Sequence, residues 1–150
     1  MPPTVHRATL ADLDGLAPLF DAYRVFYRKA SDREGARAFL HDRLSRDESV
    51  VFAARLGEGP LVGFTQLYPS FSSVQMRRVW VLNDLFVAEG ARKQGVAQAL
   101  MAEAEAFARE TGAAWVQLET EATNAPAQAL YDGLGWERDR EHWVYTRPLG

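Results

Sequence analysis

The sequence predicts a mixed α/β domain. Strand-like and helix-like segments alternate along its 150 residues, with no long linker, internal repeat or low-complexity stretch between them. Three strand segments follow one another closely, which is typical of an antiparallel meander. A strand–helix–strand order comes after the meander, and this order favours a parallel pair of strands.

The N-terminal half is expected to contain a strand, two helices and the meander. A short strand covers Thr4 to Thr9, and Ala11 to Arg28 places leucine and aromatic side chains at helical spacing, with Asp12 in the first turn. A second helix runs from Asp32 to about Arg46. The meander strands are Ser49 to Arg55, Leu61 to Tyr68 and Val74 to Val87, with a turn at Gly57-Glu58-Gly59-Pro60.

The C-terminal half is expected to add two helices and two strands. A long helix from Arg92 to Glu110 precedes a strand from Ala114 to Glu121. A shorter helix follows from Asn124 to Leu134, and a closing strand is expected around His142 to Arg147.

Composition excludes several classes of function. The formal net charge of −3 gives no basic surplus for binding phosphate backbones, so no nucleic-acid partner is expected. Without cysteine there is no disulfide, thiolate metal site or cysteine nucleophile. No metal is implied either, because His6, His41 and His142 are scattered. No leader or membrane-length apolar run is seen, which favours a cytoplasmic protein without a membrane partner.

The segment from Leu85 to Ala97 joins a buried strand to a long helix. Backbone N–H groups at such a helix start lack intrahelical acceptors, and with the helix dipole they favour an anion such as a pyrophosphate. Arg92 and Lys93 add positive charge, and Gly95 allows the backbone to approach a ligand closely. The segment therefore predicts a phosphate-binding loop.

Two nucleotide motifs and one simpler explanation compete with this interpretation. Gly90 and Gly95 have the glycine spacing of a P-loop, but Val96 and Ala97 replace its Lys and Ser or Thr. The G-x-G-x-x-G dinucleotide fingerprint is also absent. Taken alone, the two glycines are equally consistent with a plain turn into a core helix.

A second block, Asn124 to Trp136, has the pattern N-x-x-A-x-x-L-Y-x-x-x-G-W. Helical geometry places Asn124, Gln128 and Tyr131 on one stripe beside an apolar stripe, so one stripe can pack while the other faces a ligand. Gly135 stands where a left-handed helix cap is expected.

Together the two blocks resemble the GNAT superfamily of N-acetyltransferases. In that family an R/Q-x-x-G-x-G/A loop follows one strand, and an N-x-x-A-x-x-L-Y-x-x-x-G-F/W helix follows the next. The order of elements over almost the whole chain is similar too. The resemblance implies a single acetyltransferase domain over residues 1–150, with a central mixed sheet of about six to seven strands splayed in the middle and about four flanking helices.

The resemblance also implies how acetyl-coenzyme A (acetyl-CoA) would be held and used. Its pantetheine arm would enter a V-shaped opening between the strands ending at Val87 and near Glu121. Tyr131 would protonate the departing thiolate, for which a phenol with a pKa of about 10 is a feasible donor. The implied cofactor-binding residues are Leu85, Phe86, Val87, Arg92, Lys93, Gln94, Gly95, Val96, Ala97, Asn124 and Tyr131.

The general base is less clearly marked. A protonated amine with a pKa of about 10.4 must lose a proton before it attacks, and Asp84, Glu119 and an ordered water are the alternatives. Strand alternation places Leu82, Asp84 and Phe86 on one face. The segment Leu82 to Val87 resembles the L-E-D-x-x-V stretch of spermidine/spermine and thialysine acetyltransferases, except that Asn83 replaces their glutamate.

The acceptor side is expected to include the first helices and the loop from Pro69 to Ser73. Tyr23 and Tyr27 are candidates for an aromatic wall around a cationic amine, with a packed core stripe as the alternative. Asp84 and Glu119 are candidates for binding the amine as well.

Three functions compete. The first is acetylation of a primary amine on a small, polyamine-like or amino-acid-like molecule, favoured by the short acidic chain. The second is acetylation of protein lysines or N-termini, and the third is a non-catalytic acyl-CoA-sensing module. Trp143 and Tyr145 on the expected last strand are candidates for a homodimer surface.

Overall fold

One sheet of five strands organises the first of two structural units in the computed structural model, which describes all of residues 1–150. The first unit is Met1–Glu119 and the second is Thr120–Gly150. No helix in either unit is long and apolar enough to span a membrane.

The sheet confirms the predicted meander and the parallel pair. Its strands lie side by side in chain order: β1 (Pro3–Arg7), β2 (Val50–Leu56), β3 (Leu61–Ser72), β4 (Arg77–Val87) and β5 (Val116–Gln117). The first four are antiparallel to their neighbours, whereas β5 runs parallel to β4. A parallel strand requires a crossover, and a helix provides it here.

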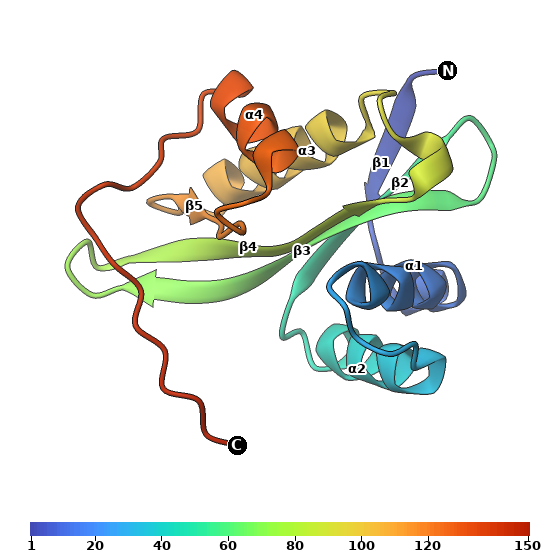
Figure 1. The fold of residues 1–150 in the computed structure, drawn as a ribbon, viewed down its shortest axis with the longest axis horizontal. Helices are drawn as coiled ribbons and strands as arrows, with labels where there is room; N and C mark the ends of the chain where they lie inside the picture. The colour runs from blue at the N-terminus through green and yellow to red at the C-terminus, as the bar shows by residue number, and fades with distance from the viewer. The chain divides into compact units, whose positions relative to one another are not determined.

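Helices cover both faces of this sheet. Helices α1 (Leu13–Phe26) and α2 (Arg33–Ser45) lie on one side, and the crossover helix α3 (Val96–Glu110) lies on the other (Figure 1). Two single 3₁₀ turns, η1 (Leu10–Asp12) and η2 (Glu89–Ala91), precede α1 and α3. The Thr9 hydroxyl and the Asp12 carboxylate form a capping box at η1, which fixes the entry to α1.

The central strands are buried on both faces because helices pack against each. In β2, Val51 and Ala53 join the core formed with α1 and α2. Phe52 points the other way, with its ring 5.7 Å from Phe107 of α3. Strand β2 therefore reads as a continuous apolar run, as expected for a strand covered on both sides.

The fold class is the predicted one, but the number of strands is five instead of six to seven. The expected strand around His142 to Arg147 is not formed, because the segment has no strand partner. Trp143 and Tyr145 are accordingly 84% and 92% exposed. In the second unit only α4 (Ala125–Gly133) forms, and Gly135 caps it with φ of +84°, as predicted.

Strand lengths also differ from expectation, most clearly in β5 and β3. β1 ends at Arg7 instead of Thr9, and β4 begins at Arg77 instead of Val74. β5 pairs through Val116 and Gln117 alone, so most of the predicted strand from Ala114 to Glu121 is irregular. β3 is longer than predicted, because Pro69 to Ser72 pairs with the first part of β4. The segment expected as an acceptor-side loop, Pro69 to Ser73, is thus mostly part of a long hairpin.

Gly63 of β3 offers a test of how tightly α3 packs on the sheet. A Cβ atom there would lie 3.0 Å from both the Phe86 carbonyl oxygen and Val96 Cγ1. We expect Gly63→Ala to lower the free energy of unfolding by about 1–3 kcal/mol, because the main chain of β4 cannot move aside freely. Urea unfolding of Gly90→Ala is the control, since a Cβ at Gly90 meets nothing within 4 Å. Equal stability of the two variants would contradict this packing.

Candidate functional site

A β-bulge in β4 determines where the predicted site residues point. Gln66 pairs with Asp84 and the next residue of β3, Leu67, pairs with Leu82, so Asn83 is an extra residue on β4. A bulge leaves one residue outside the ladder and changes the alternation of side chains beyond it.

The bulge corrects the expected alternation. Trp80 contacts Phe107 of α3 with ring centroids 5.0 Å apart, whereas Phe86 contacts Tyr23 of α1 at 6.2 Å. In a regular strand two residues six positions apart would share a face. Leu82 therefore lies with Trp80 on the α3 face, and not with Asp84 and Phe86 as predicted.

Asp84 lies in a buried polar cluster on the α1 face. Only 3% of the residue is exposed. Its Oδ2 accepts a hydrogen bond from Gln66 Nε2 at 2.5 Å, and its Oδ1 accepts one from Asn83 Nδ2 at 2.9 Å. The Tyr23 hydroxyl donates to the Asn83 carbonyl oxygen at 3.3 Å and also interacts with the Asp84 carboxyl. The cluster joins α1, β3 and β4 at the bulge.

Burial shifts the pKa values of the titratable groups in and beside the cluster. It raises the pKa of Asp84 above the ordinary 3.8, although the hydrogen bonds from Gln66, Asn83 and Tyr23 act in the opposite direction. Burial and the nearby Asp84 carboxylate raise the pKa of Tyr68 to about 12 and that of Tyr23 further still. The phenols thus stay protonated, while Asp84 becomes a stronger base than a solvated aspartate.

An aromatic wall on α1 stands next to this carboxyl. We use the term for Tyr23, Phe26 and Tyr27, the last of which directly follows α1. The Tyr27 ring contacts the other two, with its centroid 5.1 Å from that of Tyr23 and 5.2 Å from that of Phe26. Tyr23 and Tyr27 are half-buried, and Phe26 is 52% exposed. Tyr23 also contacts Phe64 of β3, so it serves as core as well as wall.

The outer edge of β4 is unpaired near the bulge. Parallel pairing with β5 is confined to Trp80 with Val116 and Val81 with Gln117. Beyond Val81, β4 continues to Val87 with no strand on that side. An extended ligand can add to such an edge through main-chain hydrogen bonds.

The loop after β4 has the features predicted for an anion site. Helix α3 begins at Val96, later than the predicted Arg92, because Lys93 and Gly95 have φ of +62° and +81° and cannot continue a helix. The amides of residues 93–98 donate to no acceptor in the chain, and the first bond of the helix is from Ala99 to the Gly95 carbonyl.

Arg92 takes a position that the sequence did not indicate. Its Nε donates to the Val87 carbonyl oxygen at 3.1 Å. Its guanidinium carbon lies 5.8 Å from the centroid of Phe26 and 5.9 Å from that of Phe86. Both Arg92 and Lys93 are exposed in the loop. Arg92 thus connects the loop to the aromatic wall.

Asn124 and Tyr131 belong to the second unit. The Asn124 side chain caps α4 by accepting a hydrogen bond from the Ala127 amide at 3.2 Å. Tyr131 is half-buried, and its ring centroid lies 6.3 Å from that of Trp136. The motif therefore has a local structural function in forming and capping the helix.

Glu119 is not brought to the cluster. It follows β5 in an irregular segment, is exposed, and makes no hydrogen bond or ion pair with Asp84. Sequence reasoning also missed Gln66, Tyr68 and Ser49. A signal was present for Gln66, because Thr65 and Gln66 interrupt an otherwise apolar run in β3.

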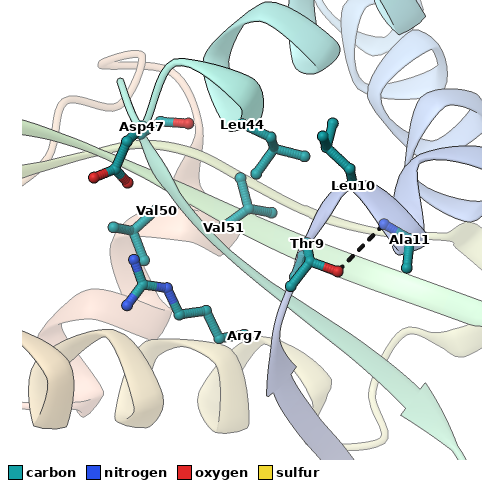
Figure 2. Close-up of a pocket in the computed structure, with 10 residues that line it drawn as sticks. Arg7, Thr9, Leu10, Ala11, Leu44, Asp47, Val50 and Val51 are labelled. Atoms are coloured by element: carbon teal, nitrogen blue, oxygen red, sulfur yellow. Dashed lines mark hydrogen bonds between the residues drawn. The ribbon is translucent and has the colours of Figure 1, made fainter.

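A cavity of about 400 Å³ opens at another part of the first unit, where β1 leads into η1 (Figure 2). None of the predicted catalytic or binding residues lines it. Its lining residues are Arg7, Ala8, Thr9, Leu10, Ala11, Leu44, Asp47, Ser49, Val50 and Val51. No group of three or more His, Asp or Glu side chains able to hold a metal ion is found in the structure.

Comparison with known proteins gives concordant results. Residues 16–136 match the model of the acetyltransferase (GNAT) family. An uncharacterized N-acetyltransferase, YhfO, of Bacillus subtilis (strain 168) is 47% identical over 135 residues, covering 90% of each chain.

Two solved structures are similar over nearly their whole length. A crystal structure of a probable acetyltransferase has a TM-score of 0.93 and 47% identity, covering 98% of both chains. AAC(6')-Iy in complex with the bisubstrate analogue CoA-S-monomethyl-acetylneamine has a TM-score of 0.81 and 19% identity, covering 99% of this chain and 100% of that one. The second likeness concerns the fold alone.

The raised pKa of Asp84 predicts an unusual dependence of stability on pH. Between 3.8 and the raised value, the folded chain holds a proton that the unfolded chain has lost, so stability falls as the pH rises through this window. Asparagine does not titrate. We therefore expect the stability of Asp84→Asn relative to wild type to increase as the pH rises, measured by urea unfolding from about pH 4 to pH 8.

Asp21→Asn is the control, and its stability difference from wild type should stay constant from about pH 4 to pH 8. Hydrogen bonds from the Ser31 hydroxyl at 2.6 Å and the Asp32 amide at 2.7 Å lower the pKa of Asp21. Its stabilising contribution is present above 3.8 and is lost as the pH falls through the lowered value. A pH-independent stability difference for Asp84→Asn would show that its pKa is not raised.

Proposed function

Because the chain belongs to the acetyltransferase (GNAT) family of acetyl-CoA-dependent N-acetyltransferases, we propose that it acetylates a primary amine of a small molecule by direct attack in a ternary complex. The buried Asp84 carboxyl beside the aromatic wall is the observation that carries this proposal. We also propose that residues 1–150 form one acetyltransferase domain. Homodimer formation and cytoplasmic location stay predictions.

The residues of the first unit are suited to hold acetyl-CoA, which supplies an acetyl group activated as a thioester. The unpaired edge at Leu85, Phe86 and Val87 would bind the pantetheine arm as an added strand. Because Arg92 already donates to the Val87 carbonyl oxygen, the arm would use the other main-chain groups of this edge. The unbonded amides of residues 93–98 and the charge of Lys93 suit a pyrophosphate. Asn124 is proposed to contact the cofactor arm.

In the proposed chemistry, Asp84 takes the proton of the ammonium group, directly or through a water. The freed nitrogen then attacks the acetyl carbonyl carbon, a C–N bond forms and the C–S bond breaks. Tyr131 donates its phenolic proton to the departing thiolate, whose conjugate thiol has a pKa of about 8.5. The second proton, lost by the acylated nitrogen, returns the Tyr131 phenolate to the phenol through solvent. The raised pKa of Asp84 supports its role as base, because it reduces the mismatch with the amine.

The acceptor is proposed to be a cationic amine of polyamine-like or amino-acid-like size. The rings of Tyr23 and Tyr27, which pack edge to face on each other, are proposed to bind the cation, and an ionised Asp84 would offer the opposite charge. The resemblance of Leu82 to Val87 to polyamine acetyltransferases supports the same class. Glu119, exposed beyond β5, is proposed to act only in attracting the cation.

The first test is turnover. We expect Tyr131→Phe to lower kcat at least tenfold (about 1.4 kcal/mol), because a phenyl ring cannot protonate the thiolate. Coenzyme A release is measured with a thiol reagent, acetyl-CoA and a panel of polyamines, amino acids and aminosugars. Tyr145→Phe, at a 92% exposed tyrosine, is the control.

The outcomes separate the competing functions. Turnover on a small amine that survives in Tyr145→Phe and falls in Tyr131→Phe supports the proposal. Turnover only on protein lysines or N-termini would redirect it to a protein acceptor. Binding of acetyl-CoA without turnover on any acceptor would favour a sensing module.

The second test concerns the cofactor loop. Gly95 has φ of +81°, so Gly95→Ala strains the loop that presents its amides, although its Cβ would meet no atom within 4 Å. We expect the Kd for coenzyme A, measured by calorimetry, to rise about tenfold, which corresponds to 1–2 kcal/mol of strain. Gly90→Ala is the matched control in the same segment, with no positive φ. Unchanged affinity in Gly95→Ala would remove the loop from the binding site.

A further inference from the structure

A chain of buried hydrogen bonds leads from Asp84 across three neighbouring strands. Ser49 Oγ, just before β2, donates to Gln66 Oε1 on β3 at 2.7 Å. Gln66 Nε2 in turn donates to Asp84 Oδ2 on β4 at 2.5 Å. The exposed fractions of Ser49, Gln66 and Asp84 are 4%, 0% and 3%.

The order of donors in this chain suits an ionised Asp84 carboxylate. A glutamine amide has one accepting and one donating end, and either can face a neighbour. The Ser49 hydroxyl donates to the oxygen, which leaves the NH₂ end directed at the carboxyl. An ionised carboxylate only accepts hydrogen bonds, so the chain matches the ionised form of Asp84.

Packing alone does not require a buried chain of polar side chains at this place. Burying a polar side chain requires that each polar atom find a partner, and an apolar residue of similar volume would fill the same space without this requirement. Here no buried side-chain polar atom lacks a partner. The cross-strand pair Gln66–Asp84 lies at the bulge, where Asp84 turns toward the aromatic wall.

We propose that Gln66, oriented by Ser49, is a positioning residue that holds the Asp84 carboxyl in one orientation and maintains its proton-accepting form during acetyl transfer. This inference rests on the proposed role of Asp84 as the base. Neither Gln66 nor Ser49 touches the reacting atoms. Their contribution is the N–H group placed on Oδ2, while Asn83 occupies Oδ1 from the exposed side.

The other polar groups around Asp84 do not replace this donor. From α1, Tyr23 interacts with the carboxyl, and Tyr27, which follows α1, acts electrostatically on Tyr23. From β3, Tyr68 faces the same charge, and Arg43 of α2 interacts with Tyr68. Arg43 is paired with Glu48 through a 3.0 Å hydrogen bond, so no unpaired cation stands beside Asp84.

The test is the pH dependence of kcat/KM. Gln66→Met keeps the volume of the side chain and removes its donor. We expect the limb of the pH profile that is assigned to Asp84 to move to higher pH by about one unit. At a given pH below that limb, about tenfold less of the enzyme would then have an ionised Asp84. Ser49→Ala should shift the limb in the same direction by less, and Ser49→Thr, which restores a hydroxyl, should return it.

Thr65→Val is the matched control. Thr65 is also fully buried in β3, but its hydroxyl donates to the Asp84 main-chain carbonyl oxygen at 2.8 Å and not to the carboxyl. The Thr65→Val variant should lose stability, but the limb assigned to Asp84 should not shift. A merely structural role for Gln66 would give the same result in Gln66→Met, and that result would overturn the inference.

A second measurement does not depend on turnover. The ¹³C chemical shift of the Asp84 carboxyl reports its titration directly, and it should move to higher pH in Gln66→Met or, if that variant does not fold, in Ser49→Ala. Full activity of Asp84→Asn would refute the proposed base. An inactive Asp84→Asn together with unshifted titration in the Gln66 and Ser49 variants would refute only the positioning role.

Discussion

The extra residue in β4 is the constraint on which the candidate site of the first unit depends. If Asn83 were a regular member of the ladder, Asp84 and Phe86 would share a face with Leu82 and Trp80, which is the α3 face where Phe107 packs. The bulge is held by side chains that occupy main-chain acceptors around it. Tyr23 donates to the Asn83 carbonyl and Thr65 to the Asp84 carbonyl. Local loss of ladder pairing is thus offset by partners from α1 and β3.

Much of the fold was predictable because hydrophobic period and turn residues act locally. The meander, α1, α2 and the left-handed Gly135 followed from such patterns. The bulge did not, because a single extra residue leaves no mark in composition and appears only when two strands are aligned. The prediction of a closing strand was wrong for a related reason. Trp143 and Tyr145 have strand-forming side chains, but their segment pairs with no other strand.

The candidate site was predicted unevenly for the same reason. Asp84 and the aromatic residues of α1 were identified by type and position, and their proximity is now observed. Gln66 and Ser49 are 17 residues apart and meet only through sheet register, which sequence spacing does not specify. Arg92 was assigned to a phosphate by its place in a motif, whereas its observed contacts are with Val87, Phe26 and Phe86. One side chain therefore links the loop to the aromatic wall.

The unpaired edge of β4 has a consequence for the handling of the protein. Such an edge accepts any extended chain, including the same segment of a second molecule, and natural sheets usually protect theirs with lysine, proline or a covering element. From Leu82 to Val87 the strand has no lysine or proline, but the bulge at Asn83 and the inward-directed Asp84 both discourage such pairing. Self-association on concentration is therefore expected only through the residues beyond the bulge, Leu85 to Val87, and a ligand lying along them would suppress it during purification and storage.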